Sequence, residues 1–411
     1  MSSEMFLGDV AEITMGQSPA GVHCNKEGDG FPLLNGPTEF GDSHPMPVQF
    51  TTDPKKKANK GDLLFCVRGS TTGRMNWADQ EYSIGRGIAA IRGKNGYPNS
   101  FIRTLIESQL EGLLVQATGS TFPNVSGKML FELCVPEISV KSASAIAGII
   151  EPIDDRIALL RETNATLESI AQAIFKSWFI DFDPVKAKQQ GEEPQGMDAA
   201  TAALFPDAFQ DSELGAIPAG WKVGSLKQAV SIFDSKRIPL SGNERAKRQG
   251  SYPYYGAASV MDYIDSYLFE GVYFLMGEDG SVVRNDGRAV VQYVWGRFWV
   301  NNHAHILQGK NGITTEHAMI FAKNLCVKPY ITGAVQAKLS QSNMWRIPFL
   351  FPSLNICECF GDTIKPIYDK IRANTDKIQT LASIRDALLP RLISGKLRLP
   401  EAEAMAGESG L

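Results

Sequence analysis

The chain has 411 residues, of which 43% are hydrophobic and 21% are charged, and its formal net charge at pH 7 is −4. This length gives room for two globular domains with connectors. The sequence contains no apolar run near the ~20 residues that a membrane-spanning helix needs. The six scattered cysteines form neither a disulfide framework nor a zinc pattern, so we expect a cytoplasmic protein without a membrane partner.

The first globular segment, residues 1–140, shows short apolar runs bounded by Gly, Asn and Asp, which is typical of strands joined by loops. Positive charge gathers around residues 55–60 and on both sides of the Gly, Ser and Thr-rich stretch 69–73. Amides and hydroxyls suit phosphate oxygens, and arginine suits the guanine edge. We therefore take six residues as candidate DNA contacts: Lys57, Lys60, Arg68, Ser70, Thr72 and Arg74.

A heptad pattern follows the first globule. Apolar residues alternate in steps of four and three from Ile146 to Trp178, which keeps one stripe of a helix facing a partner helix. The pattern predicts a long helix over residues 141–183. A kink or a restart is expected at Pro152, because proline lacks the hydrogen-bond donor that a helix needs. Residues 184–218 are rich in Asp and Glu and are interpreted as an acidic linker.

The second globular segment, residues 219–355, is basic. Its net charge is +6, whereas that of residues 1–140 is −3. Its candidate DNA contacts are Lys236, Arg237, Arg245, Lys247, Arg248, Tyr254 and Tyr255. The alternative is that half of the candidates in both segments are solvated surface and that the tyrosines belong to the core.

The end of the chain repeats its middle. Residues 364–371 resemble residues 150–157, and the register then holds without a gap, so that Leu381 falls on Leu167 and Ile384 falls on Ile170. This repeat predicts a second long helix over residues 356–398, followed by a flexible tail over 399–411.

Weaker echoes link the globules, since 93–96 recurs as 309–312 and 31–36 resembles 252–256. We therefore predict an α+β fold with a pseudo-twofold internal repeat. In it, two mixed α/β domains are joined by two long antiparallel coiled-coil helices.

Four strings in the order of the chain, 175–185, 217–221, 277–281 and 301–305, carry a resemblance to a known family. Together with the order of globule, helix, globule, helix, they make the chain resemble the specificity (S) subunit of type I restriction-modification enzymes. The first globule departs from the pattern, because it begins without the Pro-x-Gly-Trp string that opens the second one at Pro218.

The resemblance implies two target recognition domains that read a bipartite, asymmetric site on double-stranded DNA, with a spacing set by the coiled coil. It also implies two methyltransferase (M) subunits, bound to outer helix faces that include Trp178 and Phe179, and restriction/translocase (R) subunits. S-adenosylmethionine, ATP and magnesium would belong to those partners. No cofactor is therefore expected on this chain.

The residues themselves offer no catalytic constellation. The sequence has no phosphate-binding loop, no His-Glu-x-x-His zinc motif and no Gly-x-Ser-x-Gly elbow. We expect a non-catalytic protein without a metal site, in which one of His303 and His305 points inward as a structural histidine. A coiled-coil scaffold that never touches DNA stays open as the alternative, although it does not explain the basic, aromatic second globule.

Overall fold

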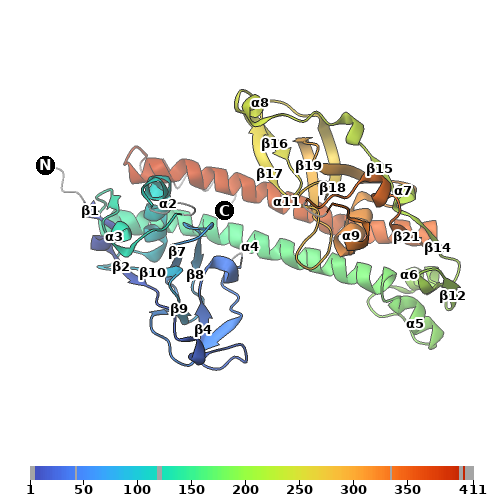
Figure 1. Ribbon diagram of the computed structural model, residues 1–411, viewed down its shortest axis with the longest axis horizontal. Coiled ribbons are helices and arrows are strands. Elements are labelled where there is room, and N and C mark those ends of the chain that lie inside the picture. The colour runs from blue at the N-terminus through green and yellow to red at the C-terminus, as the bar shows by residue number, and fades with distance from the viewer. Residues whose placement is uncertain (1–4, 42–43, 118–122, 334–335, 398–400, 403–411) are drawn as a thin grey trace. The chain divides into compact units, whose positions relative to one another are not determined.

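The computed structural model describes residues 5–41, 44–117, 123–333, 336–397 and 401–402. The chain forms two compact units, one made of Met1–Thr163 with Asn374–Leu411 and the other of Asn164–Ala373. Each unit contains a mixed α/β head and parts of two long helices, α4 (Val140–Phe179) and α11 (Leu354–Ile393), drawn in green and red in Figure 1. The tail expected over 399–411 lies outside the described residues, except for 401 and 402.

The two long helices bury the stripe that the heptad pattern predicts. In the second unit, the Asn164 side chain donates a hydrogen bond to the carbonyl of Ile371 at 3.3 Å. Further along α4, the ring of Phe175 lies 6.1 Å from that of Phe360, which comes earlier in α11. The helices therefore run antiparallel, as predicted. In the first unit, Leu160 and Leu381 share one hydrophobic cluster.

Arg385 occupies a stripe position of α11 that the heptad pattern would fill with an apolar residue. Its guanidinium donates to the Asp154 carboxylate of α4 at 2.8 Å, and its side chain is 21% exposed. A charge at a half-buried helix contact is tolerated because a carboxylate on the facing helix compensates it.

The expected helix restart at Pro152 does not occur, because α4 continues through this residue. Pro366 likewise lies inside α11. Both prolines are exposed. The carbonyl that each proline leaves without a partner lies one turn earlier on the same helix face. Water can therefore reach it, which is why neither helix breaks.

The first head combines two sheets with short helices. The four-stranded sheet has the order β2-β10-β7-β8, the five-stranded sheet has the order β3-β5-β4-β9-β6, and β1 pairs with β11. The elements are β1 (Met5–Phe6), α1 (Leu7–Val10), β2 (Ala11–Met15), β3 (Cys24–Asn25), β4 (Phe31–Leu34), β5 (Gln49–Thr51), β6 (Lys57–Ala58), β7 (Leu63–Cys66), β8 (Met75–Trp77), β9 (Tyr82–Ile84), β10 (Ile88–Gly93), α2 (Asn99–Gln116), α3 (Gly127–Phe131) and β11 (Cys134–Val135).

Strand β7 shows why an unbroken apolar run forms the centre of this head. Successive side chains of a strand point to opposite faces. Leu63 and Phe65 belong to the cluster that includes the long helices, whereas Leu64 belongs to a second cluster with Tyr82 and Ile84. The strand is buried on both faces, so both sets of positions are apolar.

The second head has one six-stranded sheet with the order β15-β20-β18-β19-β16-β17 and the two-stranded pair β14-β21. Its elements are β14 (Lys222–Ser225), α7 (Leu226–Ala229), β15 (Val230–Ile232), α8 (Gly242–Ala246), β16 (Gln249–Tyr255), β17 (Val260–Ile264), β18 (Phe269–Gly277), β19 (Val291–Val300), β20 (Ala304–Gly309), α9 (Thr315–Asn324), α10 (Gln341–Met344) and β21 (Pro348–Phe351). Within the described residues, no helix is both long and apolar enough to cross a membrane.

The segment expected as an acidic linker is folded. It contains α5 (Asp183–Gln189), α6 (Ala199–Leu204) and the hairpin of β12 (Phe209–Ser212) and β13 (Gly215–Pro218). The ring of Phe205 lies edge-on to Trp178 at 5.1 Å. The acidic residues of 184–218 therefore belong to a folded segment that packs against the end of α4.

The first of the two sequence similarities between the heads, 93–96 with 309–312, falls on equivalent turns. Asn95 after β10 and Asn311 after β20 have φ angles of 56° and 55°, in the left-handed region, and a glycine follows each. Asn and Gly adopt this conformation more readily than other residues do.

The second echo marks equivalent strands. Leu33 of β4 pairs in parallel with Ser83 of β9, and Tyr254 of β16 pairs in parallel with Trp299 of β19. In each head the parallel pair includes the strand that carries the similar string, 31–36 in the first head and 252–256 in the second. The likeness of the heads therefore extends into their interiors.

Candidate nucleic-acid interface

The loop between β7 and β8 carries the two predicted arginines of the first head. Gly69 and Gly73 have φ angles of 98° and 92°, a conformation that side chains disfavour, so glycine permits the tight reversal here. Arg68 and Ser70 are exposed on this loop. The loop therefore exposes a guanidinium and a hydroxyl, two residues apart in the sequence.

Two other predicted residues of this loop bond internally. The Thr72 hydroxyl lies 2.8 Å from the carbonyl of Gly69 and 2.9 Å from that of Pro123. The Arg74 guanidinium donates to the carbonyl of Phe40 at 2.8 Å. Arg74 remains exposed, but these bonds give both side chains a role in holding the loop in place.

The predicted lysines of the first head lie at the opposite end of β7. Lys57 is in β6 and Lys60 is in the turn before β7, and both are exposed. The Lys57 ammonium lies 3.6 Å from the centre of the Phe31 ring. The four residues of β7 span about 13 Å. The six candidates therefore form two groups rather than one patch.

The predicted arginines of the second head take part in ion pairs. Arg245 pairs with Asp262 at 3.1 Å and lies over the ring of Tyr254 at 5.1 Å. Arg248 pairs with Asp265 at 2.9 Å. To contact a phosphate, each arginine would therefore have to bind it in addition to its carboxylate or in place of that carboxylate.

Arg237 belongs to a charged cluster in the interior of the head. Its guanidinium donates to Glu278 at 2.6 Å and lies 3.4 Å from Asp234. Buried His305 lies with Nδ1 2.5 Å from Asp234, and its Nε2 donates to the carbonyl of Leu339 at 2.8 Å.

The inward, hydrogen-bonded position predicted for one of the two histidines is thus confirmed for His305. Asp234, Glu278 and His305 lie close enough together to hold a cation. The guanidinium of Arg237 already supplies positive charge to both carboxylates, so this cluster is satisfied within the protein.

The remaining four candidates of the second head differ in exposure. Lys236 and Lys247 are exposed. Tyr254 is 1% exposed, and its hydroxyl accepts a hydrogen bond from the amide of Leu240, so it occupies a core position. Tyr255 is half-buried, and burial raises its pKa to about 12. The two lysines are therefore the candidates best placed to reach a phosphate.

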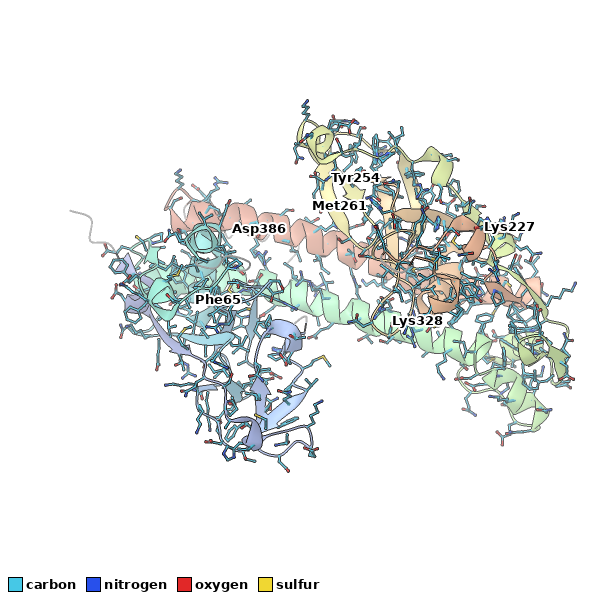
Figure 2. The ribbon with its side chains drawn as sticks, in the orientation of Figure 1. Phe65, Lys227, Tyr254, Met261, Lys328 and Asp386 are labelled. Carbon is cyan, nitrogen blue, oxygen red and sulfur yellow. The ribbon has the colours of Figure 1, made fainter. Side chains whose placement is uncertain are left out.

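Sequence reasoning missed an exposed apolar face on β17. Met261 and Tyr263, each 52% exposed, alternate with half-buried or buried neighbours along this strand. Figure 2 labels Met261 of β17 and Tyr254 of β16. Nearby, Arg297 of β19 lies over the ring of Tyr267 at 5.0 Å. The sequence of 260–264 gave no signal for this face, because apolar residues occur on both faces of the strand and no period-two pattern results.

A correction concerns the end of α4. Trp178 and Phe179 were expected on an outer face that binds partner subunits, but they are only 5% and 9% exposed. Both rings pack around Phe360 of α11, at 5.6 Å and 4.8 Å. The expectation was wrong because these large apolar residues close the core beneath the second head.

A family model for the type I restriction modification DNA specificity domain matches the chain twice, over residues 2–169 and 218–383. The chain is 25% identical over 361 residues to the type I restriction enzyme MjaIX specificity subunit of Methanocaldococcus jannaschii, an alignment that covers 83% of this chain and 79% of that protein. It is 24% identical over 413 residues to the HindI specificity subunit of Haemophilus influenzae, with 84% and 88% covered.

The fold is similar to the crystal structure of a type I restriction-modification S subunit from M. genitalium. The TM-score is 0.54 at 17% identity, over 95% of each chain. Each family match covers one head together with part of one long helix.

Proposed function

This chain belongs to the family of type I restriction modification DNA specificity domains, and we propose that it is the non-catalytic specificity subunit of such a complex. One observation carries the proposal. The family model matches the chain twice, and each match coincides with a head that has the same turn and the same parallel strand pair. A protein with two such heads can read two half-sites.

In this proposal each head is one target recognition domain, residues 1–140 and 219–355, and reads one half of a bipartite, asymmetric site on double-stranded DNA. Exposed Lys and Arg side chains would neutralise phosphates, and loop side chains would contact base edges in a groove. Arg68 is the sharpest candidate for a base contact, because it is exposed on a glycine-shaped loop, two residues before Ser70. The paired α4 and α11 would set the distance between half-sites.

The proposal assigns the chemistry of methylation and cleavage to partners. Two methyltransferase subunits and restriction/translocase subunits would bind this chain, and they would hold S-adenosylmethionine, ATP and magnesium. This chain itself would need no cofactor. The complex would act in the cytoplasm, on the DNA present there.

Co-expression tests the proposal. The chain and a methyltransferase subunit from the same organism would be produced together in a host without restriction, and the host DNA would be read by methylation-sensitive long-read sequencing. A bipartite, asymmetric methylated motif that depends on both genes is the expected result. If the chain binds the methyltransferase subunit but no motif and no DNA binding appear, a scaffold role is the correct description.

A further inference from the structure

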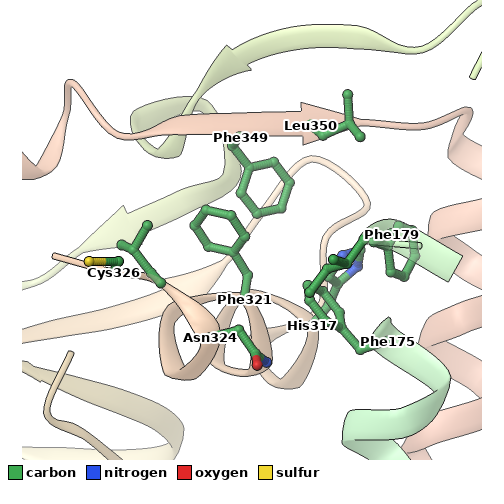
Figure 3. Close-up of a pocket in the computed structure, with 10 residues that line it drawn as sticks. Phe175, Phe179, His317, Phe321, Asn324, Cys326, Phe349 and Leu350 are labelled. Atoms are coloured by element: carbon green, nitrogen blue, oxygen red, sulfur yellow. The ribbon is translucent and has the colours of Figure 1, made fainter. Parts of the chain in front are cut away.

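A small apolar pocket opens in the second unit, beside the end of α4 (Figure 3). Its volume is about 210 Å³. The rings of Phe175, Phe179, Phe321 and Phe349 line it, and Ile180, which is 47% exposed, lies at its rim. An apolar cavity of about 150 Å³ is known to hold a benzene ring. The space therefore fits one aromatic ring.

The polar atoms around this pocket are few. His317 lines it, and burial lowers the pKa of its imidazole to about 3, so this wall carries no charge near neutral pH. The Asn324 amide donates to Gln172 at 2.6 Å and to the carbonyl of Ile320 at 3.0 Å. A nucleobase has several donors and acceptors on its edges, and this lining would leave most of them unsatisfied.

A second, wider pocket adjoins the first, and Asn324 lines both. Its volume is about 610 Å³, and four cations line it: Lys176, Arg284, Arg288 and Lys323. Lys176 pairs with Asp181, and Lys323 pairs with Glu168 of α4. Arg284 and Arg288 share the single carboxylate of Asp286, at 3.9 Å and 4.0 Å, and their side chains are more than half exposed. Four cations therefore face three carboxylates, and the unbalanced positive charge lies at the solvent-exposed arginine pair.

We propose that these two pockets together bind an acidic segment of a partner protein, which inserts one aromatic side chain into the apolar pocket and places carboxylates in the cationic one. The apolar pocket is smaller than the ~300–1,000 Å³ of typical small-molecule sites, and a single buried aromatic anchor is typical of protein interfaces. Charge complementarity selects the neighbouring residues of that segment. The inference rests on the proposed function in one respect, because the segment is expected in a subunit of the same complex.

The test uses the full chain and a short fluorescein-labelled peptide in which glutamates surround one tryptophan. Anisotropy should show saturable binding of this peptide. Binding should be lost when alanine replaces the tryptophan or lysines replace the glutamates. Exposed Cys326 lines the apolar pocket, so its alkylation should slow when the peptide is bound. Exposed Cys134, in the first unit, is the matched control and should react at an unchanged rate.

Two variants locate the binding on the surface. Ile180→Glu places a carboxylate at the rim and should weaken peptide binding roughly tenfold or more. Ile170→Glu is its control, because Ile170 is 44% exposed on α4 and lines neither pocket. The double variant Arg284→Glu, Arg288→Glu should also weaken binding.

Three results would overturn the inference: equal binding of the alanine peptide, equal weakening by both isoleucine variants, or protection of Cys326 by single-stranded DNA but not by the peptide. Motif methylation by the complex reports separately on the proposed function. If methylation needs this chain while the peptide does not bind, the inference fails and the proposed function stands.

Discussion

Acid should destabilise the second unit through one buried imidazole. His317 is 1% exposed and lies among aromatic rings, with the Phe179 and Phe360 centres 4.6 Å and 4.8 Å away. Burial lowers its pKa from 6.5 to about 3. As the pH falls below 6.5, the unfolded chain takes up a proton that the folded chain refuses. Above pH 6.5 the imidazole is neutral in both states and does not lower the free energy of unfolding. As the pH falls from 6.5 toward 3, proton uptake by the unfolded chain lowers the free energy of unfolding progressively.

The magnitude follows from the two pKa values. The loss is about 1.4 kcal/mol at about pH 5.5 and about 2.7 kcal/mol at about pH 4.5. The His317→Phe variant lacks the titrating group, so its free energy of unfolding should lack this component. Urea unfolding at about pH 7.5 and about pH 5.5 measures both proteins. Intrinsic fluorescence reports mainly on the second unit, because it contains Trp178, Trp221, Trp295, Trp299 and Trp345.

A core variant that keeps His317 provides the control. Phe349 is 1% exposed, and its ring centre is 5.9 Å from that of His317. Phe349→Leu should cost about 1–2 kcal/mol at both pH values, so its curve should run parallel to that of the wild type. If wild type and His317→Phe lose equal stability between the two pH values, the buried neutral imidazole is not the cause and the reasoning is refuted.

Three further predictions concern DNA reading. Inserting four residues after Thr166 lengthens α4 by about 6 Å, which is close to the length of two base pairs. The gap in the methylated motif should therefore change by roughly two base pairs, and both half-sites should stay the same. An unchanged gap contradicts a spacing role for the helices. Replacing 219–355 by the matching segment of a relative should change one half-site in the sequenced motif, and a change in both would show that the heads are not independent. Arg68→Ala should lower cognate binding by about 1–3 kcal/mol if the arginine contacts guanine, whereas Lys57→Ala should weaken cognate and random duplexes alike and reduce the salt slope by about one. Titrations at several salt concentrations separate these outcomes, and an Arg68→Ala protein with unchanged preference for its site would exclude that contact.

The long helices were predictable because their signal is local. A heptad stripe requires only that residues three and four apart share a face, and the stripe from Ile146 to Trp178 is buried or half-buried as expected. The antiparallel pairing also followed, from two matched stripes in one chain. The compensation of Arg385 by Asp154 did not follow, because it joins residues far apart in the sequence across a helix contact whose alignment no local pattern gives.

The candidate DNA contacts were harder to predict, for the same reason. Sequence shows where positive charge gathers, but not which carboxylate each side chain meets. Arg237 meets Glu278 from the end of β18, and Arg245 meets Asp262 from β17. Both partners lie well beyond the basic stretch, so charge along the chain overstates the charge that remains available at the surface.

The folding of 184–218 escaped prediction because its apolar residues are sparse. Val185, Phe205 and Ile217 are each almost fully buried, yet acidic and small residues separate them, so no period of 3.6 or 2 emerges. Their burial depends on Trp178, Phe179 and Trp221, which supply the surface onto which they pack. A segment of this kind is ordered by its contacts and not by its own pattern.

The contrast between the two heads explains how one fold can read two unlike sequences. The backbone repeats, since Asn95 and Asn311 share one turn conformation and both heads contain the same parallel strand pair. The exposed side chains singled out above differ in kind and in place: Arg68 and Ser70 lie on the loop after β7 of the first head, and Met261 and Tyr263 lie on β17 of the second. Base identity is read by donors, acceptors and apolar contacts at the groove edge. If these side chains face the groove, a guanidinium with a hydroxyl and a methionine with a tyrosine would present different chemistry to that edge. Two half-sites of different sequence are therefore the expected ligand of these heads.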